Sequence, residues 1–186
     1  MQIPKLVKDA KQAAARLQFH RSCLDEVGEL LALLVGHSSS FPVLEVGTGA
    51  GVGTAWLASQ GGGPIYTVEI DEDLAEAART LFATEPQITV VTGDWASALS
   101  FGPFGLVFAD VKSAKREGAD QLVGALQPGG WIVLDDLTPM EYWPEEWRGK
   151  PDLVRETWLQ HPDLMGMEIR TSARVSVIVA RRTWTV

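Results

Sequence analysis

The sequence predicts an α/β fold, a Rossmann-like doubly wound sheet of about seven mostly parallel strands, and three observations support this. Short apolar runs alternate with amphipathic segments from residue 41 onward. The first run ends in a glycine-rich turn, Gly47 to Gly53, from which a helical pattern starts. Two apolar runs near the end, 164–170 and 173–180, lie close together and predict a hairpin with one antiparallel strand. Strands separated by helices form parallel units with right-handed crossovers.

The remaining elements follow in order along the chain. Strands are expected at 42–47, 65–70, 87–92, 104–109 and 131–134, besides the hairpin. Helices are expected at 4–18, from 23 to about 35, at 52–60 and from Asp71 to about 82. A short helix is expected to start at 93, and longer ones at about 114–126 and at 152–160. Turns are expected at 36–40 and 61–64, and a long aromatic-rich loop at 135–150, which either forms an acceptor pocket or lid or packs its aromatic side chains onto the core.

The chain is expected to form a single domain, with residues 1–40 as an N-terminal helical cap and residues 41–186 as the Rossmann-like core. The two helices of the cap either cover the carboxyl edge of the sheet or form the face of a homodimer. The segment that joins them, 19–22, is expected to approach a ligand, whereas His20 and Cys23 are expected to pack at helix boundaries.

Composition excludes several classes of partner. The formal net charge of −8 argues against a broad nucleic-acid surface, which needs clustered lysine and arginine. No apolar run approaches the roughly 18 residues that a membrane span requires. The lone Cys23 fits a reducing compartment. We therefore expect a cytoplasmic protein that binds a small molecule, with no nucleic acid and no membrane.

The glycine-rich turn predicts a nucleotide-like ligand, because bare backbone at a helix N-terminus lets another molecule lie on the main chain. The glycines alternate, so Val52 stands where the dinucleotide fingerprint needs its third glycine. Glu45, two residues before Gly47, would repel a phosphate and attract an ammonium or sulfonium. The alternative is a turn that merely tolerates glycine.

Acidic residues end or follow each parallel strand, at the edge where open α/β sheets bind ligands. Glu69 is placed to accept from ribose hydroxyls, and Asp94 from an adenine amino group. Trp95 either stacks on the adenine ring or packs in the core. Asp110 ends the fourth strand, and Asp135 with Asp136 follows the fifth.

The pattern E-x-G-x-G-x-G resembles the cofactor motif of class I S-adenosylmethionine-dependent methyltransferases. With Val68 to Asp71, Phe108 to Asp110 and Gly129 to Asp136, residues 20–136 are similar to the small O-methyltransferases related to catechol O-methyltransferase. The resemblance implies a cofactor site made of Glu45, Gly47, Thr48, Gly49, Gly51, Gly53, Glu69, Ile70, Asp94, Trp95 and Asp110.

In that family, an aspartate after the fourth strand and an acidic pair after the fifth hold a divalent metal. The resemblance thus implies Asp110, Asp135 and Asp136 as ligands of Mg²⁺ or another divalent cation, and Asp110 with Lys112 as catalytic residues. Lys112 stands two residues after Asp110 where the family has three, so Lys115 is a second candidate for the base. The acidic pair is Asp-Asp where Asp-Asn is commoner.

The expected function is S-adenosylmethionine-dependent O-methylation of a small molecule, assisted by a divalent metal where the acids bind one. The alternatives are a metal-independent N- or carboxyl-methyltransferase and a catalytically silent S-adenosylmethionine-binding protein. A nicotinamide oxidoreductase is disfavoured by the glycine spacing and by Glu45. A nucleic-acid amino-methyltransferase is disfavoured because the fourth strand ends Ala109-Asp110-Val111-Lys112, without the Asn/Asp-Pro-Pro-aromatic motif.

Overall fold

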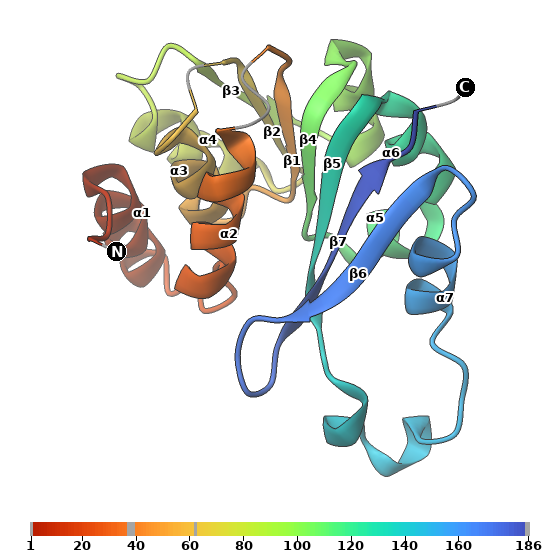
Figure 1. Cartoon of the computed structure of the whole chain (residues 1–186). Helices are drawn as coiled ribbons and strands as arrows, with labels where there is room; N and C mark the ends of the chain where they lie inside the picture. Colours follow the sequence, from red (N-terminus) through yellow and green to blue (C-terminus); the bar gives the residue numbers. More distant parts are fainter. Residues whose placement is uncertain (1, 37–39, 62, 185–186) are drawn as a thin grey trace.

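The computed structural model describes residues 2–36, 40–61 and 63–184, and the expected turns at 36–40 and 61–64 lie partly outside these ranges. One sheet has the strand order β3-β2-β1-β4-β5-β7-β6 (Figure 1). The first five strands pair in parallel. They are β1 (Val43–Val46), β2 (Ile65–Glu69), β3 (Ile88–Thr92), β4 (Phe104–Ala109) and β5 (Leu126–Leu137).

The C-terminal hairpin completes the sheet as predicted. β7 (Ser176–Arg182) pairs antiparallel with β5 and with β6 (Leu164–Arg170). β6 therefore runs in the direction of the parallel strands and forms an edge of the sheet. The predicted fold class, a mostly parallel sheet with one antiparallel C-terminal strand, is confirmed.

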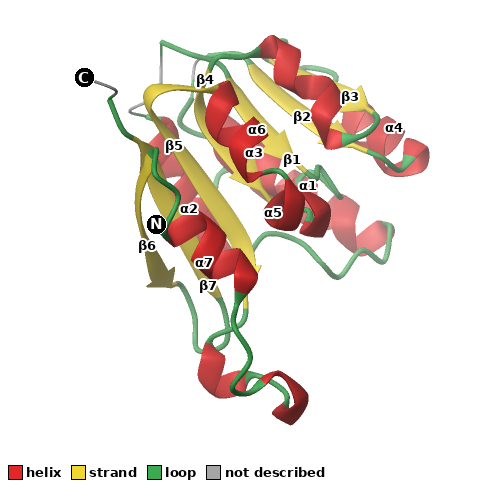
Figure 2. Ribbon diagram, turned by 90° about the vertical axis from the view of Figure 1, so that its right-hand side faces the viewer, coloured by secondary structure: helices red, strands yellow, loops and turns green. Residues whose placement is uncertain are grey.

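Helices cover both faces of the sheet (Figure 2). One layer holds α1 (Lys5–Arg16), α2 (Asp25–Val35), α3 (Val52–Ala58) and α4 (Glu72–Leu81). The other holds the 3-10 helix η1 (Trp95–Phe101), α5 (Lys112–Glu117), α6 (Ala119–Ala125) and α7 (Leu153–Leu159). In β4, Leu106 and Phe108 pack under the first layer, and Val107 and Ala109 under the second. Burial on both faces explains why this strand has no polar residue.

The N-terminal helices do not cap the carboxyl edge of the sheet: α2 lies on a face of the sheet, and α1 packs against α3 and α4. Val27, Leu31 and Val35 of α2 pack against strand residues such as Leu106 and Val133. An apolar helical stripe of this width needs a broad apolar partner, which a sheet face offers and a polar strand edge does not. Among the described N-terminal residues, the segment between α1 and α2 is the part that reaches the carboxyl edge.

Two further boundaries differ from the sequence expectation. The helix expected at 114–126 is interrupted at Gly118, where a side chain would stand 2.8 Å from both the Trp95 ring and the Ala114 carbonyl oxygen. β5 starts at Leu126 and not at 131, because the expected turn at Pro128 forms an irregularity inside the strand, with Gly129 at a φ of 79°. After β5, the long loop contains the 3-10 turns η2 (Met140–Tyr142) and η3 (Glu145–Trp147).

Among the described residues, no helix combines the length and apolar character that crossing a bilayer demands.

Candidate functional site

A cavity of about 440 Å³ opens at the carboxyl ends of β1, β2 and β4. This volume is within the range of pockets that hold small molecules and cofactors. It is lined by the α1–α2 segment (Phe19, Arg21, Ser22, Cys23), by Glu45 and the glycine loop (Gly47, Thr48, Gly49, Ala50, Val52, Gly53), by Glu69, Ile70, Asp71 and Leu74, and by Phe108, Asp110, Val111, Lys112 and Asp136.

The glycine loop forms the floor of this cavity, and its conformation requires glycine. Gly47 and Gly49 have φ values of 99° and 52°, which side chains rarely tolerate. A β-carbon on Gly47 would lie 2.8 Å from Val111, and one on Gly49 would lie 2.9 Å from the Phe19 ring. The loop is therefore enclosed between β4 and the α1–α2 segment, with its backbone against the cavity.

Glu45 is a buried carboxyl at the centre of the site, with 1% of its surface exposed. The hydroxyls of Thr54 and Thr67 donate to its Oε2, the latter at 2.6 Å. Burial raises the pKa of Glu45 to about 8, although these two hydrogen bonds lower it in part. Gly53 gives this carboxyl its space, because a β-carbon there would overlap Oε1. A cation entering the cavity would lower the pKa of Glu45 and favour its charged form.

Glu69, at the end of β2, holds the glycine loop against the next strand. Its Oε2 accepts from the Gly49 amide at 2.8 Å, and its Oε1 accepts from the amides of Ile70 and Asp71 at 2.9 and 3.0 Å. A carboxylate has about four acceptor sites, so capacity remains for a ligand hydroxyl. A role toward ribose stays a prediction.

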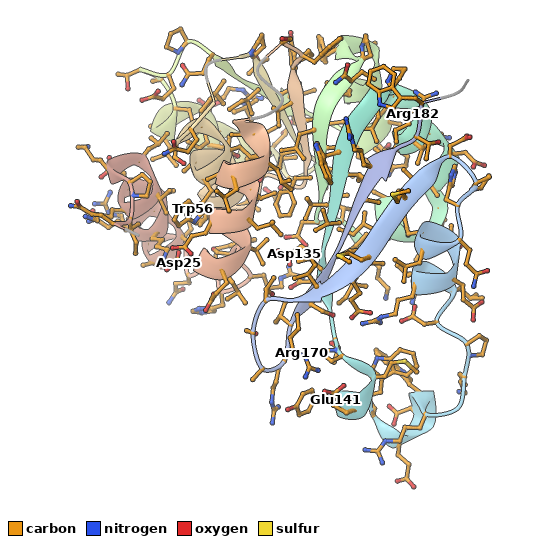
Figure 3. All side chains as sticks on the ribbon, viewed as in Figure 1. Asp25, Trp56, Asp135, Glu141, Arg170 and Arg182 are labelled. Carbon is orange, nitrogen blue, oxygen red and sulfur yellow. The ribbon has the colours of Figure 1, made fainter. Side chains whose placement is uncertain are left out.

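Three acids meet at the other end of the cavity, where Asp110 follows β4 and Asp135 and Asp136 lie in the last turn of chain within β5. Asp110, Asp135 and Asp136 can each place one oxygen within 4.8 Å of the others. Figure 3 shows Asp135 at this edge of the sheet. Asp136 has a φ of 56°, and its amide donates to Asp135 Oδ1 at 2.8 Å. Consecutive acids in a regular strand would point to opposite faces, and this turn brings them together.

Burial also changes the protonation of these acids. It raises the pKa of Asp110 to about 7, against the charge of Lys115, and that of Asp135 to about 6. Asp110 Oδ1 is buried without a hydrogen-bond partner in the described part of the chain, and Lys115 Nζ lies 3.5 Å from it. Lys115 Nζ also donates to the Asp135 carbonyl at 2.8 Å.

The two candidate lysines occupy different places. Lys112 is the first residue of α5 and lines the cavity. Lys115, one helical turn later, is only 11% exposed and is held between the acids. Of the two, Lys112 is the one on the cavity surface, which is where a base must meet an acceptor. Its catalytic role stays a prediction.

Most of the expected cofactor residues line the cavity, but three do not. Gly51 caps the start of α3 with a φ of 85° and lies against Phe82. Asp94 caps η1 by accepting from the Ala96 amide at 3.0 Å. Trp95 packs against the core and beside Gly118. Contact of these residues with an adenine ring therefore remains a prediction.

Phe108 is a cavity residue that sequence reasoning missed. It is 1% exposed, in the middle of an apolar strand, and nothing in its sequence context separates it from a core residue. Leu74, in the first turns of α4, was missed for the same reason. The α1–α2 segment, by contrast, reaches the cavity as expected, and Cys23 lines it as well as packing against both helices.

The aromatic loop after β5 lies outside the residues that line the cavity. Trp143 is buried, donates to the Thr138 carbonyl at 3.0 Å within the loop and lies with its ring centroid 6.0 Å from the guanidinium carbon of Arg155 on α7, so it packs the loop onto the body of the protein. Tyr142 is exposed and lies under the guanidinium groups of Arg170 and Arg174. Figure 3 shows Arg170 and Glu141, which form an ion pair, further out than Asp135.

The strand order, the bare glycine loop and the acids at the carboxyl edge are the features by which this domain can be compared with known protein families. Residues 43–130 match the family model described as a methyltransferase domain. Fold, site and this match are all similar to those of class I S-adenosylmethionine-dependent methyltransferases.

Within that class, the chain is similar to catechol O-methyltransferase from Mycobacterium tuberculosis, with 34% identity over 120 residues. The match covers 59% of this chain and 54% of that protein, so the chain spans about half the length of this curated relative. The ribosomal protein L11 methyltransferase of Citrifermentans bemidjiense is 27% identical over 119 residues, covering 63% of this chain and 39% of that protein.

Among solved structures, the O-methyltransferase from Bacillus cereus in complex with S-adenosylhomocysteine has a TM-score of 0.81. It shares 22% identity with this chain, and the superposition covers 98% of this chain and 94% of the other. At this identity, the likeness establishes the fold.

Proposed function

We propose that the protein transfers a methyl group from S-adenosylmethionine to an oxygen atom of a small molecule. The observation that carries this proposal is the single cavity that joins the glycine loop and Glu69 to Asp110 and Asp136. S-adenosylmethionine carries a sulfonium and an ammonium but no phosphate, so the buried acids attract it and would repel a dinucleotide. The S-adenosylhomocysteine bound to the Bacillus cereus neighbour supports the same choice of ligand.

The residues divide between holding the cofactor and serving the acceptor. Glu69 and Ile70 would hold the adenosine end, and the glycine loop and Glu45 the amino-acid end. Methyl transfer from sulfur is an in-line displacement, in which the protein aligns donor and acceptor and excludes water. Lys112, on the cavity wall, would take the proton of the acceptor hydroxyl, and Asp110 would orient the reacting groups.

A divalent cation fits the acids at this end. Asp110, Asp135 and Asp136 would hold it, since they can converge within 4.8 Å and Asp110 Oδ1 is buried without a hydrogen bond. Carboxylate oxygens are the ligands that Mg²⁺ prefers. When bound, such an ion stabilises an acceptor oxyanion.

One observation favours a second candidate, methyl transfer without a metal. Lys115 Nζ lies 3.5 Å from Asp110 Oδ1, so the acids already have a positive charge beside them. In that case the acceptor atom is an oxygen of lower pKa, a carboxylate, or a nitrogen. A catalytically silent binder of S-adenosylmethionine would have the same cofactor half of the site and no turnover.

The proposal also includes the domain organisation, the oligomeric state and the location expected from the sequence. Residues 1–186 would act as one domain whose helical cap, 1–40, contributes to the cavity through the α1–α2 segment. A homodimer, a cytoplasmic location and the absence of a nucleic-acid partner stay predictions from the sequence.

Thermal shift with two ligands tests the cofactor. S-adenosylhomocysteine at 100 times its dissociation constant should stabilise the protein by about 2.7 kcal/mol, whereas NADH should have no effect. Stabilisation by NADH alone would show that the cofactor is wrong.

The metal has a separate test. Asp135→Ala and Asp136→Ala should abolish Mg²⁺-dependent turnover and keep S-adenosylhomocysteine binding, and Asp73→Ala, at an exposed site on α4, serves as the matched control. Turnover that is indifferent to EDTA would instead support the metal-independent candidate.

A further inference from the structure

β5 becomes irregular at the point where it carries two of the three acids. Its antiparallel pairing with β7 is regular up to Leu134, and the next pair joins Leu137 to Ser176. Between these two pairs β5 takes three steps and β7 only two, so Asp135 and Asp136 form a β-bulge. Bulges re-aim side chains and are frequent beside active sites. This bulge brings two consecutive acids toward the third acid of the site.

The backbone of Asp136 carries the unusual conformation of the bulge. Its φ of 56° lies in the left-handed region, which aspartate and asparagine adopt more readily than other residues with a side chain. Such a conformation costs free energy, and it persists only where the surrounding structure holds it. The neighbouring elements should therefore contain groups that hold the bulge.

Side chains from three other elements bond to backbone carbonyls on both sides of the bulge residue. The Asp135 carbonyl accepts from the largely buried lysine of α5 at 2.8 Å. The Leu137 carbonyl accepts from the Ser176 hydroxyl of β7 at 3.0 Å. The Thr138 carbonyl accepts from Arg155 Nη2 of α7 at 3.0 Å. Side chains thus hold the backbone where the regular strand pairing is interrupted.

Ser176 is itself fixed by a buried ionic network. It is 1% exposed, and its hydroxyl also bonds to the Glu168 carboxylate of β6. That carboxylate accepts from Arg155 Nε at 2.8 Å and from Nη2 at 2.7 Å. Replacing a whole buried ionic network by apolar residues is often neutral for stability, so some proteins retain such networks for the geometry that they fix. Here the network lies directly behind the bulge.

We propose that Ser176 is a positioning residue that fixes the bulge and so holds the Asp136 carboxylate in place for a divalent cation. This inference rests on the cation of the proposed function. It assigns part of the metal affinity to a residue that does not touch the ion. Removing a group that supports a metal ligand typically weakens metal binding by about 10- to 100-fold.

Calorimetric titration of the S-adenosylhomocysteine-loaded protein with Mg²⁺ tests this role. Ser176→Ala removes the bond to the Leu137 carbonyl, so it should raise the dissociation constant of Mg²⁺ about tenfold or more. The dissociation constant of S-adenosylhomocysteine should stay unchanged. Ser176→Thr keeps the hydroxyl and should remain close to the wild type. Ser97→Ala is the matched control, because the exposed Ser97 hydroxyl also donates to a backbone carbonyl, that of Asp94.

A second measurement requires no metal. The Asp136 amide donates to Asp135 Oδ1, so its hydrogen exchange in the metal-free protein reports on the bulge. Exchange at this amide should be faster in Ser176→Ala than in the wild type, with no change at the amides of β1, two strands away from β5. A purely structural role for Ser176 predicts faster exchange throughout the sheet and equal weakening of both ligands.

The outcomes separate this inference from the proposed function. The inference is overturned if Ser176→Ala binds Mg²⁺ as tightly as the wild type, or loses affinity for Mg²⁺ and S-adenosylhomocysteine equally. Wild-type protein that binds S-adenosylhomocysteine but not Mg²⁺ would overturn it together with the metal, and would leave methyl transfer standing. Wild-type protein that binds neither would show that the proposed function itself is wrong.

Discussion

Replacing Glu45 with glutamine isolates the energetic effect of the buried carboxyl behind the glycine loop. Glu45→Gln keeps an oxygen that can accept from Thr54 and Thr67, but removes the titrating group. Burial raises the pKa of Glu45 from 4.5 to about 8 in the folded protein. Between these two values the folded chain keeps a proton that the unfolded chain has released.

The sign of the effect follows from this difference. Because the folded state binds more protons, the free energy of unfolding falls as the pH rises through the window. Each pH unit well inside the window removes about 1.4 kcal/mol, so the contribution of Glu45 should fall by about 3–4 kcal/mol between about pH 5 and pH 8. Below the unfolded pKa of 4.5 this penalty disappears.

Urea unfolding of ligand-free wild type and Glu45→Gln across this pH range measures the effect. Asp110 and Asp135 also have raised pKa values, so both proteins lose stability with pH for that reason, and the difference between them reports on Glu45. The wild type should lose stability relative to the variant as the pH rises. A difference that stays constant from pH 5 to 8 would refute the assignment of a buried, largely protonated Glu45.

Three further substitutions probe other parts of the site and its support. Gly53→Ala places a β-carbon on Glu45 Oε1, so S-adenosylhomocysteine affinity should fall by about tenfold or more in calorimetry. Lys115→Met leaves Asp110 without its ion-pair partner and should cost about 3 kcal/mol of unfolding free energy above pH 7, where Asp110 is charged, and less at pH 5, where Asp110 is protonated. Arg155→Met removes a buried guanidinium bonded to two acids and a carbonyl oxygen, and should cost about 3–5 kcal/mol by urea unfolding.

Matched controls exist for two of these variants. Gly124→Ala is the control for Gly53→Ala, because nothing lies within 4 Å of a β-carbon there. Arg79→Met breaks an exposed pair with Glu76 and should change stability by less than about 1 kcal/mol. Equal losses in Arg79→Met and Arg155→Met would contradict the structural role of Arg155, and a pH-independent loss in Lys115→Met would contradict its pairing with Asp110.

Local patterns predicted most elements of the fold. Runs such as Phe104 to Ala109 are buried on both faces, so none of their residues is polar, and such a run predicts a parallel strand. The helix start at Asp71 was predicted for a similar reason, since its side chain accepts from the Asp73 and Leu74 amides in the same turn and so caps α4. Gly118 is different: at this interruption of a helix, the ring of Trp95, a residue distant in sequence, leaves no room for a side chain.

The cavity wall formed by Glu45 and the glycine loop was predictable because its residues lie close together in the sequence. Glu45 and the glycines belong to one strand and one turn, so their spacing alone predicts the ligand class. Asp94 and Trp95 were assigned by their place after β3, yet they do not line the cavity, since the sequence does not give the distance from a strand end to a ligand.

The sequence by itself determined the strand-and-helix order, the glycine turn and an acid at each strand end, because these depend on neighbouring residues. Only the tertiary structure decided that Lys115 pairs with Asp110, that Asp110, Asp135 and Asp136 converge, and that Ser22 faces the cavity. These relations join segments far apart in the chain, and they depend on how α5, β5 and the α1–α2 segment pack at one edge of the sheet. Side-chain distances of a few ångströms across such packing are not encoded in any local pattern.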